Sequence, residues 1–191
     1  MKRFLWLILI LLAACTPKIP PPGEREPEPP SLSPATSLVN EGMDLARQRR
    51  FPEALMRLRE AIEVDPRFAE AHARLGILYR RLGELEQARE ALSQSLELSP
   101  KNSKFLYAMG TVFFDLEEYK RAEQVFRKSW SLDGSLNSLF SLGETLQRLG
   151  RESQAADAWR EYLRRDADSV WGREASRRLE ELKAGDESRG R

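Results

Sequence analysis

The sequence repeats itself at intervals of 34 residues, and this periodicity restricts the possible folds more than any other feature. A column of glycines has this spacing: Gly42, Gly76 and Gly110, with Gly143 one residue early. A column of alanines follows the same rule: Ala54, Ala88, Ala122 and Ala155. Larger apolar side chains fill a third column: Leu58, Leu92, Phe126 and Trp159. A period of roughly 20 to 50 residues indicates an array of similar units, each stacked on its neighbours.

The residue types favour two helices in each unit. Leu, Arg, Glu and Ala dominate, and aromatic residues make up only 8% of the chain, which favours helices over strands. Pro66 and Pro100 are suited to end the second helices, because proline cannot continue an α-helix. Glycine inside a helix costs about 1 kcal/mol relative to alanine. A glycine that recurs at one place in the first helices therefore indicates close approach of the second helix.

The second unit, residues 69–100, carries the pattern most fully: Leu75, Gly76, Tyr79, Gly83, Ala88, Leu92 and Pro100. With these residues the chain resembles the tetratricopeptide repeat (TPR) family. The resemblance implies an all-α TPR α-solenoid of four helix-turn-helix repeats within residues 36–167, at about 35–68, 69–102, 103–135 and 136–168. A stripe of Trp171, Ala175, Leu179 and Leu182 predicts a C-terminal capping helix over residues 169–183. Residues 184–191 are polar, and we expect them to form a disordered tail.

The N-terminus has the features of a secretory signal. Lys2 and Arg3 precede an apolar run, Phe4 to Ala14, that is shorter than the roughly 20 residues a membrane span needs. The sequence Leu-Ala-Ala-Cys that ends at Cys15 resembles the bacterial lipobox. The resemblance implies a lipoprotein signal peptide over residues 1–14, with lipid attached to Cys15, the only cysteine of the chain. An ordinary signal peptide is the alternative.

Residues 15–35 form the predicted link between this cysteine and the repeats. Eight of residues 16–35 are proline, and no apolar periodicity is present. Proline disfavours helix and sheet, so we expect a disordered linker of polyproline II character. A tether that holds the repeats away from a bilayer is the favoured interpretation, and a ligand for a proline-binding domain is the alternative.

In TPR proteins the first helices line a concave groove, which predicts the binding site here. The resemblance places these candidates in it: Arg47, Ala73, Ile77, Arg80, Arg81, Tyr107, Thr111, Phe114, Phe140, Glu144 and Arg148. Aromatic and Arg side chains often carry interface energy, so an extended peptide or helix with apolar anchors and acidic flanks is the expected partner. Alternatively, the rings pack against the next repeat and the arginines form a solvated surface. Val39 and Met43 stand where TPR proteins of the chaperone type use Lys and Asn to bind a C-terminal carboxylate. We therefore do not expect recognition of that kind here.

Several functions are disfavoured by the same sequence. A net charge of +1 provides no electrostatic basis for binding nucleic acid. One Cys and one His cannot form a structural zinc site, and no motif indicates a cofactor, a small-molecule substrate or a catalytic nucleophile. His72 aligns with Leu38, Leu106 and Leu139, which predicts a packing role.

The predicted function is a noncatalytic, lipid-anchored interaction scaffold that helps to assemble bacterial envelope machinery. In lipoproteins of the enteric type an aspartate directly after the cysteine favours retention in the inner membrane. The resemblance therefore implies that Thr16 at this place favours the outer membrane, with the repeats in the periplasm. The resemblance to pilotins and to helpers of outer-membrane protein assembly supports this class. A docking or activating subunit of a cell-wall enzyme is the alternative, and direct action on peptidoglycan is a weaker one.

Overall fold

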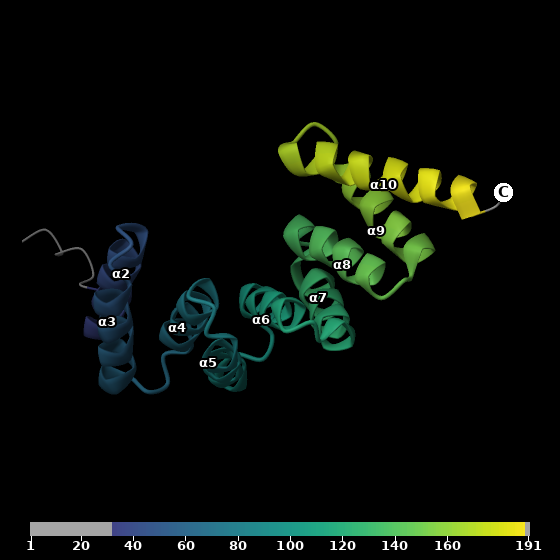
Figure 1. The fold of residues 1–191 in the computed structure, drawn as a ribbon. Helices are drawn as coiled ribbons and strands as arrows, with labels where there is room; N and C mark the ends of the chain where they lie inside the picture. The colour runs from purple at the N-terminus through teal and green to yellow at the C-terminus, as the bar shows by residue number, and fades with distance from the viewer. Residues whose placement is uncertain (1–31, 190–191) are drawn as a thin grey trace, which may run out of the picture. The chain divides into compact units, whose positions relative to one another are not determined.

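The computed structural model describes residues 32–189, with side chains described as far as residue 185. Within this range all regular structure is helical (Figure 1). The helices are α2 Pro34–Arg47, α3 Phe51–Val64, α4 Ala69–Arg81, α5 Leu85–Leu98, α6 Ser103–Asp115, α7 Tyr119–Asp133, α8 Leu136–Arg148, α9 Glu152–Arg165 and α10 Val170–Arg189. The predicted all-α fold is therefore confirmed. The predicted signal peptide, Cys15 and most of the linker lie outside the described residues.

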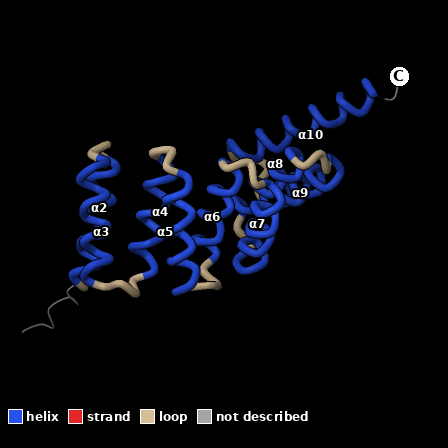
Figure 2. Tube along the Cα trace, turned by 60° about the horizontal axis from the view of Figure 1, so that its bottom comes forward, coloured by secondary structure: helices blue, strands red, loops and turns tan. Residues whose placement is uncertain are grey.

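The helices form four hairpins, α2–α3, α4–α5, α6–α7 and α8–α9, joined by short loops (Figure 2). Each first helix contacts its own second helix, and α2, α4 and α6 each also contact the first helix of the next hairpin. The recurring glycines explain how closely each hairpin is packed. A Cβ added to Gly76 would lie 2.7 Å from Leu92 Cγ, and one on Gly110 would lie 2.5 Å from Phe126 Cε1. The glycine and large-residue columns are thus the two sides of one contact within each hairpin.

The turn inside each hairpin uses a left-handed backbone residue at the same repeat position. Gly83 has φ of 81° and Gly150 has φ of 71°. The equivalent residues of the other hairpins are Arg49, with φ of 63°, and Glu117, with φ of 60°. The fold therefore imposes this conformation even where the residue is not glycine.

The second helices end in different ways. Helices α3 and α5 end at Val64 and Leu98, each just before a repeat proline. Helix α7 ends at Asp133, and Gly134 follows it as a left-handed C-cap with φ of 66°. In the third unit, therefore, the helix is ended by a glycine in left-handed conformation, whereas the first two units have a proline, which cannot continue a helix.

Two helix ends differ from the predicted boundaries. Helix α2 begins at Pro34, which the sequence placed in the linker. Ser33 caps this helix, because its Oγ accepts a hydrogen bond from the Thr36 amide, and proline is favourable in the first helical turn. Helix α10 continues to Arg189, into the segment predicted as a disordered tail. Ion pairs such as Lys183–Glu180 support the helix where the tail was expected to begin.

Helix α10 packs against α9 and also reaches α8. Ala175 is fully buried, and Leu179 and Leu182 contact the core. Arg178 Nη2 lies 3.2 Å from Glu144 Oε1, and its Nη1 donates to Gln147 Oε1 at 3.1 Å. Helix α10 thereby closes the exposed side of the fourth hairpin.

Candidate functional site

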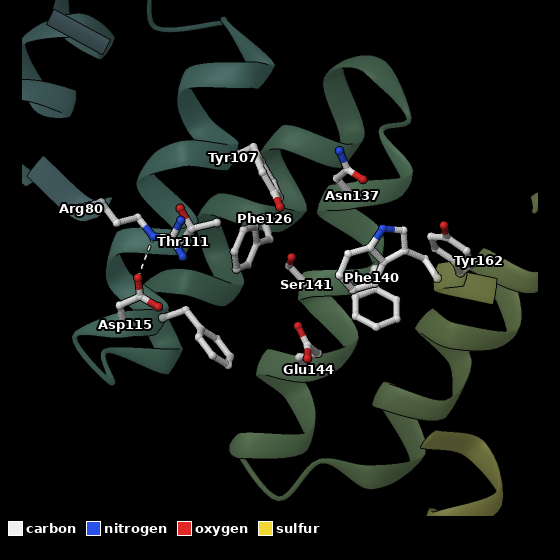
Figure 3. A pocket seen from close by; sticks show the side chains of 12 residues that line it. Arg80, Tyr107, Thr111, Asp115, Phe126, Asn137, Phe140, Ser141, Glu144 and Tyr162 are labelled. Carbon is white, nitrogen blue, oxygen red and sulfur yellow. Dashed lines mark hydrogen bonds and ion pairs between the residues drawn. The ribbon is translucent and has the colours of Figure 1, made fainter. Parts of the chain in front are cut away.

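A pocket of about 220 Å³ lies between α6 and α8 and forms the candidate site (Figure 3). Six aromatic side chains line it: Tyr107, Phe114, Phe126, Phe140, Tyr162 and Trp171. They come from five helices, so the pocket depends on the stacking of the third and fourth hairpins and on α10. Burial of aromatic surface is the usual basis of a side-chain-binding pocket.

Phe140 is the centre of the aromatic wall. Its ring centroid lies 5.1 Å from that of Trp171 and 5.8 Å from that of Tyr162, both in edge-to-face geometry. Its side chain is only 5% exposed. Phe140 therefore forms the base of the pocket and also packs within the core. Tyr107 is half-buried, with its ring 5.8 Å from Phe126.

The polar side chains of the pocket are Arg80, Thr111, Asp115, Asn137, Ser141 and Glu144. Arg80 Nε donates to Asp115 Oδ2 at 2.6 Å, an ion pair that joins α4 to α6 (Figure 3). Asn137, Ser141 and Glu144 come from α8. The Thr111 hydroxyl donates to Ala108 O within its own helix. The wall therefore offers both hydrogen-bonding groups and carboxylates beside the rings.

Burial raises the pKa of Glu144, and the charge of Arg178 opposes that shift. Two further charges act on this pKa: Glu174 raises it and Arg148 lowers it. Loss of water disfavours the charged carboxylate, so the ionised form of Glu144 gains from a nearby cation.

Six of the eleven predicted groove residues line this pocket: Arg80, Tyr107, Thr111, Phe114, Phe140 and Glu144. The other five lie elsewhere: Arg47, Ala73, Ile77, Arg81 and Arg148. The structure thus gathers the third-unit candidates, two of the three from the fourth unit, and Arg80 of the second unit. It leaves apart the first-unit candidate and most of those from the second unit.

The placement of Ala73 as a groove-lining residue is wrong. Ala73 is 1% exposed and belongs to the hydrophobic core, so its side chain is not available to a ligand in the groove. Ile77 is exposed on α4. Arg47 is exposed and forms an ion pair with Asp44 in its own helix. None of these three reaches the pocket.

The remaining two arginines interact within the protein. Arg81 donates to Ala46 O at 3.2 Å, and its guanidinium lies 5.0 Å from the centre of the Phe51 ring. The Arg148 guanidinium lies 5.8 Å from the Phe114 ring and 5.9 Å from the Tyr119 ring. These positions show an intramolecular role that the sequence pattern did not reveal.

The candidate list omitted other residues that line the pocket. Phe126 belongs to the large-residue column of the second helices, which suggested core packing alone. Trp171 belongs to the predicted capping stripe, but it is 55% exposed and contacts Phe140 at the pocket edge. Tyr162 lies on α9, outside the first-helix positions. The family pattern selects only first-helix residues, so it could not identify these three.

His72 is half-buried, and its Nε2 lies 3.0 Å from Pro66 O. Among the residues that the structure describes, no group of three or more His, Cys, Asp or Glu side chains could hold a metal ion. No helix in the described part of the chain is long and apolar enough to cross a bilayer.

Sequence profiles of the tetratricopeptide repeat match residues 39–103 and 74–134, and a second repeat profile matches residues 137–169. The chain belongs to the tetratricopeptide repeat family. This membership and the groove geometry support a protein–protein interaction scaffold.

Two curated TPR-containing relatives show how limited the likeness to any whole protein is. Hsp70-Hsp90 organizing protein 1 of Glycine max is 25% identical over 130 residues, or 68% of this chain. The type IV pilus assembly protein PilF of Pseudomonas aeruginosa is 24% identical over 131 residues, or 64% of this chain. The matches span 23% of the soybean protein and 50% of PilF.

Solved structures show the same fold. P. aeruginosa PilF aligns with a TM-score of 0.73 at 20% identity, over 81% of this chain and 69% of that one. The first TPR of Spaghetti, solved with an HSP90 peptide, aligns with a TM-score of 0.59 at 19% identity, over 61% of this chain and 93% of that one. These structural alignments establish the fold. At 20% identity or below they do not indicate what this chain binds, which must be argued from its own residues.

Proposed function

We propose that this protein is a lipid-anchored TPR scaffold of the bacterial envelope, which holds an extended segment of a partner protein at the α6–α8 pocket. The observation that carries the proposal is the pocket itself. Its six rings are accompanied by hydrogen-bonding groups on α6 and α8, the combination that anchors a side chain and fixes its orientation.

The anchor is proposed from the sequence. Cys15 follows Leu-Ala-Ala at the end of a short apolar segment behind Lys2 and Arg3. Multiple acyl chains hold a protein on a membrane more stably than one chain can. The residues between Cys15 and Ser33, the cap of α2, would then tether the repeats near the periplasmic side of the outer membrane. The likeness to PilF, described as a type IV pilus assembly protein, supports a role in assembly of envelope machinery.

Site-specific crosslinking tests the binding surface. A photoreactive amino acid replaces Asn137, an exposed residue on the pocket wall, in the full chain expressed in bacteria. The matched control carries it at Lys128, an exposed residue of α7 outside the pocket. We expect one discrete partner adduct from position 137 and none from position 128. Equal adducts from both positions would contradict the proposed groove.

Substitution of a pocket ring provides a second test. Tyr107→Ala removes a half-buried ring from the wall and should reduce recovery of the crosslinked partner at least about tenfold, as expected for an interface anchor. Leu132→Ala removes an exposed apolar side chain outside the pocket and serves as the control. Thermal unfolding of both variants separates lost binding from lost folding. Full recovery with folded Tyr107→Ala would contradict the proposal.

The anchor has its own test. Metabolic labelling with a palmitate analogue should mark the wild-type chain and not Cys15→Ser, and the signal peptidase II inhibitor globomycin should block processing. Labelling of Cys15→Ser at the wild-type level would exclude the proposed attachment site while leaving the pocket proposal intact.

A further inference from the structure

Some charged side chains of the α6–α8 pocket are already paired within the protein, and another is only partly neutralised and can still bind a charged group of a partner. The charged residues that line it are Arg80, Asp115 and Glu144. Arg80 already pairs with Asp115 at 2.6 Å, so its cation is engaged within the protein. The carboxylates on the wall outnumber its cations by two to one.

Glu144 is only partly neutralised. Its ion-pair partner is Arg178, at 3.2 Å, and Arg178 also holds Glu174, with 2.8 Å between Nε and Oε1. The guanidinium of Arg178 is thus shared between two carboxylates, and it lies closer to Glu174, which is outside the pocket, than to Glu144. Arg148 also favours the ionised form of Glu144, but its guanidinium lies over the Phe114 and Tyr119 rings. The pocket wall therefore retains negative charge at Glu144.

Among the described residues, no guanidinium group lies over three of the pocket rings. The protein itself places guanidinium groups over the rings of Phe51, Tyr79, Phe113, Phe114 and Tyr119. In the part of the chain that the structure describes, Tyr107, Phe140 and Trp171 have no such cation over them. An aromatic face attracts a cation, and carboxylates beside the ring strengthen that preference.

The arginines that suggested a partner with acidic flanks are engaged elsewhere. Arg80 pairs with Asp115, and Arg81 and Arg148 lie over rings. An acidic side chain in the pocket would approach Asp115 and Glu144 and would have no free cation on the wall. Like charges brought together in this way disfavour binding.

We propose that the pocket takes a basic side chain, Arg or Lys, from an extended segment of the partner protein. The aliphatic stem would lie against Tyr107 and Phe140, and the cation would lie between the rings and the partly neutralised carboxylate of Glu144, with the Arg80–Asp115 pair beside it. A volume of about 220 Å³ suits one long side chain. This inference rests on the proposed function of the groove and specifies the chemistry of its occupant.

Peptides of one design test the specificity. Acetylated and amidated heptapeptides, Gly-Ser-Ala-X-Ala-Ser-Gly, carry Arg, Lys, Leu or Glu at X. The readout is the indole N–H resonance of Trp171 in the full-length protein in detergent micelles, assigned with Trp171→Phe. We expect the Arg and Lys peptides to bind about fivefold more tightly than the Leu peptide, and the Glu peptide to bind most weakly.

Two carboxylate variants provide the matched comparison. Glu144→Gln and Glu174→Gln each remove a partner of Arg178, but only Glu144 lines the pocket. Glu144→Gln should weaken the Arg peptide about fivefold and leave the Leu peptide unchanged. Glu174→Gln leaves both carboxylates of the pocket in place but lets Arg178 pair more fully with Glu144, so it should weaken the Arg peptide by less than Glu144→Gln does. Asp115→Asn should act like Glu144→Gln, because it also frees the Arg80 cation.

The outcomes separate this inference from the proposed function. Tighter binding of the Leu or Glu peptide than of the Arg peptide would overturn the basic anchor and leave the groove proposal standing. Unchanged affinity of Glu144→Gln for the Arg peptide would also overturn it. If no peptide shifts the Trp171 resonance and Asn137 also gives no partner adduct, both proposals fail.

Discussion

Trp159 of α9 lies directly against the backbone of Gly143 on α8, so that a Cβ added to Gly143 would lie 2.4 Å from the indole Nε1. The same contact occurs in every hairpin, with the large residue sixteen positions after the glycine. The corresponding nearest approach is 2.5 Å for Gly110, 2.7 Å for Gly76 and 3.0 Å for Gly42. The large residue changes from Leu to Phe to Trp along the chain, and the space beside the glycine decreases accordingly.

Gly143→Ala should therefore lower the free energy of unfolding by about 2 kcal/mol, as expected for overpacking, even though alanine favours a helix by about 1 kcal/mol. Urea unfolding followed by circular dichroism measures the change. Gly42→Ala is the control, because its Cβ would lie 3.0 Å from Leu58 Cγ, the longest of the four approaches, and a smaller shift would relieve the contact. Equal stability of the two variants would contradict this explanation of the glycine column.

The left-handed residues in the hairpin turns lead to a second prediction. Glu117 has φ of 60° in a place where two of the other three turns use glycine, Gly83 and Gly150. Replacing it with glycine should raise the free energy of unfolding by about 1 kcal/mol, because a side chain disfavours left-handed backbone. Thermal and urea unfolding measure the gain.

The reverse substitution is the control for backbone strain. A Cβ on Gly83 would have no atom within 4 Å, so Gly83→Ala tests conformation without a packing change. We expect a loss of about 1 kcal/mol. A stabilised Gly83→Ala, or a destabilised Glu117→Gly, would show that the turn does not impose the left-handed conformation in solution.

The sequence predicted the hairpins because their contacts recur in it. Gly76, Ala88 and Leu92 occupy columns whose residues touch one another, so the period reveals the packing. The pocket was predicted only in part. Phe140 and Tyr107 follow the first-helix pattern, whereas Trp171 reaches the pocket from α10, where no repeat pattern assigns it. The engagement of Arg80 by Asp115 and of Glu144 by Arg178 depends on side-chain geometry between helices, which residue spacing does not determine.

Helix caps make a third prediction. The Asn102 side chain accepts hydrogen bonds from the amides of Lys104 and Phe105 at the start of α6, and Ser135, at the start of α8, makes no such bond. Asn102→Ala should lower the free energy of unfolding by about 1 kcal/mol, and Ser135→Ala should have a much smaller effect. Urea unfolding compares them, and equal losses would contradict the assigned caps.

The carboxylates that bind Arg178 predict opposite responses to acid. Hydrogen bonds from Arg177, and then from Arg178, lower the pKa of Glu174 from 4.5 to about 2. Because this pKa is lower in the folded state, the stabilisation from Glu174 is present above pH 4.5 and is lost as pH falls toward 2. The stability advantage of wild type over Glu174→Gln should therefore shrink over that range in urea unfolding.

The pKa of Glu144 is shifted in the opposite direction to that of Glu174, because burial raises it above 4.5. A carboxyl group whose pKa is higher in the folded state contributes its full stabilisation below pH 4.5 and loses it as pH rises through the folded-state pKa. The stability of wild type relative to Glu144→Gln should therefore increase as pH falls from 7 to 4.5, while the comparison with Glu174→Gln stays constant above 4.5. If both comparisons changed with pH in the same direction, the assignment of Glu144 to a desolvated pocket wall would be wrong.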